Sequence, residues 1–173
     1  MKSVAARVTG FCLLAAAAAG AGEVMLPDLD ISKTKQGWKE AGRDFNLNGR
    51  RLKVAGREYL RGLATHSTSE LYVDLRGARR FLAEVGTDDT SDQPDKKMVF
   101  QVIGDRRLLW QSEPMKRGDP PVAVDLDVSP FQTLLLRVDP WHDNTHADHA
   151  DWLNARFVTE GGTAPQTVGP QNW

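Results

Sequence analysis

The sequence predicts an all-β domain of the sandwich or barrel type, and three observations carry that prediction. From residue 52 onward, short runs alternate in polarity or are rich in branched residues, with turn signals between them. Segments 71–75 and 122–128 alternate between apolar and polar residues, as half-buried strands do. No segment has a sustained helical stripe, and the best candidate is a single turn near residues 37–43.

The expected strands are, in chain order, 52–54, 59–65, 70–75, 80–86, 98–103, 107–111, 122–128, 133–138 and 152–158. Glycine-containing pairs at 55–56, 76–77 and 104–105 supply tight turns between them. We expect one domain over residues 23–160. The remaining residues, 161–173, are rich in Gly, Pro, Thr and Gln and are expected to form a flexible tail.

The first 22 residues have the features of a cleaved signal peptide. Lys2 and Arg7 precede a short apolar run, and small residues follow it, as in secretory leaders. The run is too short to cross a bilayer. We therefore expect a secreted or periplasmic protein. Cys12 is the single cysteine and lies within this leader, so the processed chain is expected to contain neither a disulfide nor a thiolate metal ligand.

The charge balance argues against some classes of partner. The chain carries 22 basic and 23 acidic side chains, with a formal net charge of −1. A nucleic-acid-binding domain needs a basic face, which this composition does not favour. The sequence therefore predicts a protein that binds no nucleic acid and that has no membrane span.

Four polar loops are expected to meet at one end of the sandwich. If successive strands run antiparallel, the loops at His66, 87–92, 112–120 and 141–151 all leave strands at the same end. The last of these lies in a segment that holds three of the four histidines and two tryptophans. Such loops on a rigid scaffold usually carry function. The alternative is a solvated loop whose polar side chains only cap their own backbone.

Sugar binding suits the composition of this rim, because sugars need a flat aromatic ring and groups that exchange hydrogen bonds with hydroxyls. Trp141 is the expected aromatic platform, since Pro140 and the polar loop hold it outside a strand. Trp38, Trp110 and Trp152 are expected in the core. His66 has an equally good alternative as a buried histidine that bonds a backbone carbonyl.

Metal binding and catalysis are alternative hypotheses for the same polar residues. His142, His146 and His149 with Asp143, Asp148 and Asp151 could form an imidazole–carboxylate site for zinc or iron, but their spacing suits a helix that the segment does not favour. The sequence favours structural calcium over these metals, bound by Asp30 and Asp151 if the terminal strands pair. No glycine pattern marks a nucleophilic serine, and the adjacent Asp88 and Asp89 should diverge.

Four segments together resemble the sequence blocks of the NPCBM family of carbohydrate-binding modules. They are 59–71, 80–89, 99–105 and 148–156, with shorter similarities at 29–31, 37–38 and 43–44. The resemblance extends from about residue 26 to residue 158. It implies an antiparallel jelly-roll β-sandwich of the galactose-binding-like type, recognition of galactose-containing glycans, and a structural calcium ion. Such modules are usually appended to glycoside hydrolases.

The resulting prediction is a non-catalytic module that binds a galactose-type glycan at its loop rim. The resemblance and the loop composition together give the candidate ligand-binding residues His66, Asp88, Asp89, Trp141, His142, Asp148, His149 and Trp152. Asp30 and Asp151 are the candidate metal ligands. Two alternatives remain: a module that binds an envelope or extracellular protein through the same rim, and a metal-dependent hydrolase.

Overall fold

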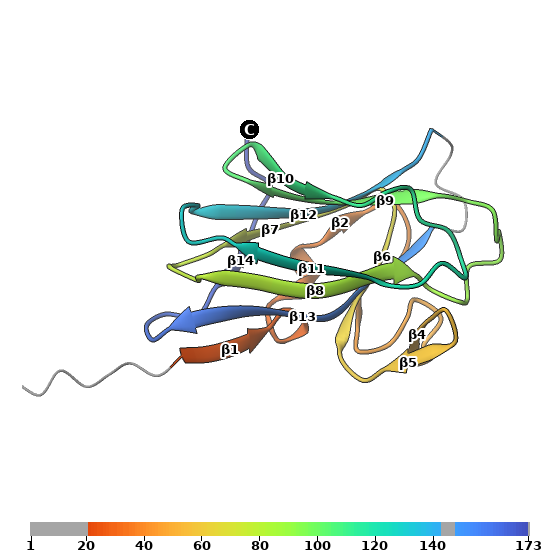
Figure 1. Ribbon diagram of the computed structural model, residues 1–173, viewed down its shortest axis with the longest axis horizontal. Helices are drawn as coiled ribbons and strands as arrows, with labels where there is room; N and C mark the ends of the chain where they lie inside the picture. Colours follow the sequence, from red (N-terminus) through yellow and green to blue (C-terminus); the bar gives the residue numbers. More distant parts are fainter. Residues whose placement is uncertain (1–20, 143–147, 173) are drawn as a thin grey trace, which may run out of the picture.

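A computed structural model describes residues 21–142 and 148–172 of the chain and consists of two antiparallel sheets that lie face to face (Figure 1). The elements are β1 (Ala21–Met25), η1 (Leu26–Asp28), η2 (Ile31–Lys33), β2 (Lys35–Gln36), β3 (Gly42–Arg43), β4 (Leu52–Val54), β5 (Arg57–Tyr59), β6 (Gly62–His66), β7 (Ser69–Asp74), β8 (Arg80–Thr87), β9 (Met98–Gly104), β10 (Arg107–Gln111), β11 (Val122–Asp127), β12 (Thr133–Pro140), β13 (His149–Glu160) and β14 (Gln166–Val168). The predicted all-β antiparallel sandwich is confirmed.

The two sheets have separate strand orders. Sheet A runs β11-β8-β13-β6-β3, and β1 also pairs with β13; sheet B runs β10-β9-β12-β7-β14, and β2 also pairs with β7. The expected strand 59–65 is two strands, because β5 ends at Tyr59 and β6 begins at Gly62. Four strands were not predicted: β1, β2, β3 and β14.

The main core lies between the inner faces of the two sheets and is rich in aromatic rings. Trp152 from sheet A meets Phe100 from sheet B edge to face, with ring centroids 5.4 Å apart. Phe81 and Phe157 pack beside them with centroids 5.1 Å apart. All four rings are buried, so that this core stabilises the sandwich by excluding water from large apolar areas.

The β4–β5 hairpin forms a second, smaller core with residues of β6 and β13, among them Ala64 and Leu153. Its contact with sheet A needs glycines at two positions. A Cβ added at Gly86 would lie 2.5 Å from Val54, and one at Gly62 would lie 2.8 Å from Leu52. The hairpin therefore lies so near the sheet that no larger residue fits there.

The strand register brings the four polar loops to one end of the sandwich. His149 pairs with His66, and Ala150 pairs with Thr87, so the ends of β6, β8 and β13 lie together. Met98 bridges Met115, which places the 112–120 loop at the same end. The predicted convergence of these loops is confirmed for their described residues.

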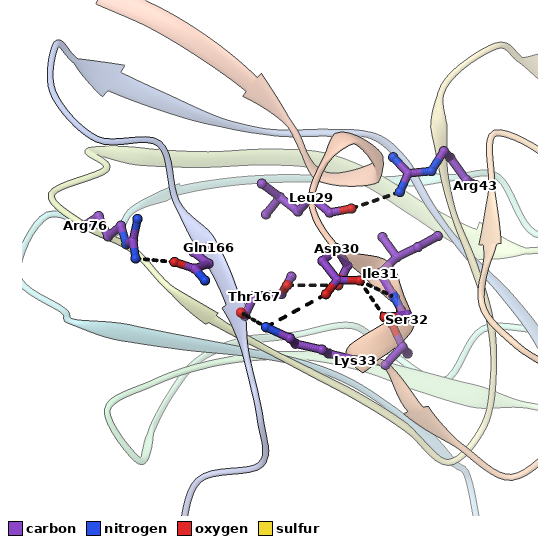
Figure 2. Close-up of polar contacts among 10 residues, drawn as sticks. Leu29, Asp30, Ile31, Ser32, Lys33, Arg43, Arg76, Gln166 and Thr167 are labelled. Atoms are coloured by element: carbon purple, nitrogen blue, oxygen red, sulfur yellow. Dashed lines mark hydrogen bonds and ion pairs between the residues drawn. The ribbon is translucent and has the colours of Figure 1, made fainter.

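The predicted flexible tail is wrong over the part that forms β14. This strand pairs with β7, and the side chain of Thr167 is fully buried. As Figure 2 shows, the Thr167 hydroxyl donates to the Asp30 carbonyl over 2.9 Å, and Lys33 Nζ donates to the Thr167 carbonyl over 2.9 Å. Hydrogen bonds with the N-terminal region thus hold a segment whose composition alone predicts disorder.

Within the described part of the chain, no helix has the length and apolar character needed to cross a membrane.

Candidate functional site

Three rings from separate parts of the chain form a cluster at the loop end of the sandwich, which we call the aromatic cluster: Trp38, His66 and His149. Trp38 stacks on His149, with centroids 5.5 Å apart and ring planes 13° apart. His66 is 5.3 Å from Trp38 and 5.8 Å from His149. Both histidines are buried, whereas Trp38 is 41% exposed. An indole at this position offers an apolar surface to a ligand.

The sheets position the two histidines, and a loop positions the tryptophan. His66 ends β6 and His149 begins β13, where they are direct partners in the ladder. Trp38 follows β2, whose edge pairing with β7 brings the chain to the rim. The Gln36 amide donates to the Trp38 carbonyl over 3.0 Å and fixes the turn that carries the indole.

A lysine completes the surroundings of the indole. Lys39 Nζ lies 4.2 Å from the centroid of the Trp38 ring, within the range of a cation–π contact. The same Nζ donates to the Leu47 carbonyl over 2.8 Å. The ammonium group is therefore held over the face of the ring and can donate to a bound hydroxyl or anion.

Each histidine ring has one described hydrogen bond, made through Nδ1. His66 Nδ1 is 2.7 Å from the Ser67 carbonyl oxygen, and His149 Nδ1 is 3.3 Å from Thr90 Oγ1. Burial, followed by the nearby His66, lowers the pKa of His149 below its ordinary value of 6.5. A neutral imidazole at His149 is therefore favoured near pH 7.

Asp88 and Asp89 have structural partners in the described residues. Asp88 is fully buried and accepts hydrogen bonds from the Asn46 amide at 3.2 Å, the Lys53 N–H at 3.2 Å and the Thr90 N–H at 2.8 Å. Asp89 accepts from the N–H groups of the β4–β5 turn, at 3.0 and 2.9 Å. Their carboxylates hold the loops that surround the cluster.

Two other candidates are buried. Trp152 is 1% exposed and lies in the core, so its assignment as a ligand-binding residue is wrong: as part of a central strand, it fills the space between the sheets. Asp148 is fully buried, and its carboxylate accepts from the Ser67 hydroxyl. This bond fixes the chain next to His66 and His149.

Trp141 and His142 lie at the same end of the sandwich but outside the cluster. The Trp141 N–H donates to the Lys97 carbonyl over 3.0 Å, and its ring contacts the His142 ring with centroids 4.2 Å apart. Trp141 is 39% exposed, as a platform must be, yet its only described ring contact is His142. His146 and Asp143, from the candidate zinc or iron set, lie outside the described residues.

A groove runs beside the aromatic cluster. It encloses about 340 Å³ and is lined by Lys35, Gln36, Gly37, Ser67, Thr68 and Glu70. Gly37 and Ser67 directly adjoin Trp38 and His66 in the chain, so the groove lies next to the segments that carry two of the three rings. Glu70 also pairs with Arg137 over 2.7 Å. The groove offers polar side chains to a part of a ligand that extends beyond the indole.

The structure does not pair Asp30 with Asp151 as a calcium site. Asp30 is exposed; its carboxylate accepts from the Ser32 N–H and approaches Lys33 Nζ at 3.9 Å (Figure 2). Asp151 is buried, and burial together with neighbouring Asp88 raises its pKa well above 3.8. Hydrogen-bond donors already surround Asp88. No group of three metal-ligating residues exists among the described residues. Asp30 and Asp151 thus have different surroundings, and a structural calcium ion at these residues stays a prediction.

Trp38 was expected in the core, and its exposed position in the aromatic cluster was not predicted from the sequence. The available signal was its position between Gly37 and Lys39, outside any apolar periodicity. That context is compatible with exposure, but it does not identify His66 and His149 as neighbours of the ring. The pairing of the two histidines became visible only through the register of β6 and β13.

Comparison with known proteins gives consistent matches. Residues 22–158 match the model of the NPCBM/NEW2 domain. Alpha-1,3-galactosidase B of Akkermansia muciniphila is 28% identical over 84% of this chain, which spans only 19% of that relative. The CBM51-2 and INT domains of Clostridium perfringens ZmpB, in complex with GlcNAc, superpose with a TM-score of 0.74 at 26% identity, covering 80% of this chain and 32% of theirs.

A second solved structure supports the same fold. The CBM51 module of Clostridium perfringens GH95, in complex with methyl-galactose, has a TM-score of 0.72 and 24% identity, with 79% of this chain and 99% of that chain covered. The family match covers most of the chain and agrees with the observed sandwich. The chain belongs to the NPCBM/NEW2 domain family, a family of carbohydrate-binding modules rather than of catalytic domains.

Proposed function

We propose that this domain binds a galactose-type glycan at the aromatic cluster. The observation that carries the proposal is the half-exposed indole of Trp38, stacked on His149 beside His66. A pyranose has an apolar ring face that packs against an indole, while its hydroxyl groups exchange hydrogen bonds with imidazole and ammonium groups. Lys39 and the adjoining groove extend the set of polar groups that a sugar can reach.

Two relatives support the choice of galactose over other hexoses. One similar module is bound to methyl-galactose, and one similar protein is named as a galactosidase. Another similar module is bound to GlcNAc, so that both sugars belong in the first binding experiments. We expect weak affinity, on the order of micromolar to millimolar, because hydroxyl groups exchange water for protein at little net gain.

The test is isothermal calorimetry of the chain with methyl β-galactoside, using GlcNAc as a second probe. Trp38→Ala should weaken binding of the galactoside at least about tenfold, because it removes the apolar platform. Trp141→Ala is the matched control: it replaces a second rim tryptophan of similar exposure, and the affinity should change less than about twofold. Unfolding curves of both variants separate loss of binding from loss of fold.

Two results would count against the proposal. One is the absence of binding to either sugar at millimolar concentration. The other is a binding protein in which Trp141→Ala abolishes affinity and Trp38→Ala does not, because the platform would then lie outside the aromatic cluster.

A further inference from the structure

The hydrogen bonds of the two histidines determine which ring nitrogen carries the proton. A neutral imidazole has one N–H donor and one acceptor nitrogen. His66 Nδ1 is 2.7 Å from the carbonyl oxygen of Ser67. A carbonyl oxygen has no hydrogen to give, so Nδ1 must be the donor. The lone pair of His66 therefore lies on Nε2.

The same conclusion follows for His149 through a chain of two hydrogen bonds. The Thr90 hydroxyl donates to the Asp88 carboxylate, which also accepts from the N–H of Thr90 and the amide of Asn46. A threonine hydroxyl has a single hydrogen. Only lone pairs of Thr90 Oγ1 remain for the His149 Nδ1 at 3.3 Å. His149 Nδ1 is therefore a donor, and its Nε2 is an acceptor.

Within the described part of the chain, both Nε2 atoms are available to a ligand. Neither has a hydrogen-bond partner among the described residues. Neither is among the partnerless side-chain atoms that are buried away from solvent. Their rings are 5.8 Å apart, and both contact the exposed Trp38. The cluster thus combines one apolar surface with acceptor nitrogens on two neighbouring rings.

We infer that His66 and His149 act as a pair of acceptors, and that the site takes a saccharide with two free hydroxyl groups that donate to them. This inference rests on the proposed function and specifies its ligand. Sugars that are methylated or acylated at either hydroxyl should be excluded, because they have no hydrogen to donate at that position. Thr90 is a positioning residue, since it acts on the ligand only through the tautomer of His149.

The tautomers are tested first, without a ligand, by long-range ¹H–¹⁵N correlation spectra of the chain at about pH 8, where histidines are neutral. Both imidazoles should be Nδ1–H. Thr90→Val removes the acceptor of His149 and should shift His149 toward Nε2–H, while His66 is unchanged because its partner is a backbone carbonyl. Thr159→Val, the same substitution at the far end of β13, should alter neither ring.

Finding His66 or His149 mainly as Nε2–H in the unaltered chain would overturn the inference. So would an unchanged His149 tautomer in Thr90→Val, because the hydroxyl would then not control the proton.

The ligand side is tested by calorimetry with methyl β-galactoside, its monodeoxy derivatives and the matching monodeoxyfluoro derivatives. Carbon-bound fluorine can accept weakly but cannot donate. At two ring positions, both the deoxy and the deoxyfluoro sugars should bind about tenfold more weakly. Recovery of affinity by fluorine at those positions would show that the hydroxyl groups accept, which contradicts the inference.

The outcomes separate the inference from the proposed function. If the galactoside does not bind at all, the proposed function fails, and the inferred ligand class fails with it, while the spectra still test the tautomers. If the galactoside binds and fewer than two hydroxyl groups matter as donors, the proposed function stands and the paired-acceptor inference is wrong.

Discussion

At the scale of single residues, Asp151 is the group least suited to its surroundings. It is buried on β13, and neither of its carboxyl oxygens has a hydrogen bond of good geometry among the described residues. Burial first, and then the neighbouring Asp88 and Asp89, raise its pKa well above 3.8. The folded protein therefore keeps a proton on Asp151 that the unfolded chain releases above about pH 4.

This proton sets the sign of a pH effect on stability. Where the folded state binds more protons than the unfolded state, the free energy of unfolding falls as the pH rises. Asp151 thus makes the fold less stable on going from about pH 4 toward its raised pKa. His149 acts in the opposite direction. Its pKa is lowered below 6.5, so the unfolded chain binds the proton more readily than the folded protein does. The free energy of unfolding therefore falls as the pH drops below 6.5. The free energies of unfolding of a variant and of the unaltered chain must therefore be compared at the same pH.

Asp151→Asn should stabilise the fold at neutral pH, because the amide keeps the shape and cannot ionise. In urea unfolding, we expect the free energy of unfolding to rise by about 1–3 kcal/mol near pH 7.5 and by less near pH 5. Asp95→Asn, at a side chain that is 92% exposed, is the control and should change little. A less stable Asp151→Asn protein, combined with stabilisation of the unaltered chain but not of the variant by calcium, would contradict this expectation and would favour a calcium-binding carboxylate.

At the scale of elements, β14 shows how a short polar strand is fixed by contacts far away in the chain. Thr167 donates to the Asp30 carbonyl, and its own carbonyl accepts from Lys33. Arg76 at the end of β7 also donates to Gln166 (Figure 2). The strand thus links the C-terminal segment to η2 and to the edge of sheet B, and it should contribute to stability.

Thr167→Val should destabilise the fold by about 1–2 kcal/mol, because the Asp30 carbonyl loses its buried donor while the side-chain volume is preserved. Thr163→Val is the matched control, since Thr163 is exposed and precedes β14. Chemical unfolding of the two variants measures the difference. Equal stabilities would mean that the hydroxyl of Thr167 adds nothing to the attachment of β14.

The strands that could be predicted are those whose own residues specify burial. Segment 122–128 alternates because one face of its strand is solvated, and this pattern is visible in the sequence alone. The two-residue strands β2 and β3 exist only because β7 and β6 offer edges to pair with. Their own residues contain no comparable pattern, since strand propensity depends strongly on context.

At the scale of the whole molecule, connectivity was easier to predict than side-chain roles. Counting antiparallel strands was enough to bring the four polar loops to one end, where His66 meets His149. The roles of Trp38 and Trp152 were harder, because either indole could fill a core of this size. The strand register distinguishes the two roles. Trp152 points inward from the central strand β13, while Trp38 lies on a loop beyond an edge strand.

At this scale we propose one glycan site, formed by the aromatic cluster. Titration of the ¹⁵N-labelled chain with methyl β-galactoside tests this claim most directly. We predict saturable shifts of the Trp38 indole and of the His66 and His149 imidazoles, with the Trp141 indole nearly unaffected. Shifts confined to Trp141 and His142, with the aromatic cluster unchanged at saturation, would contradict the claim.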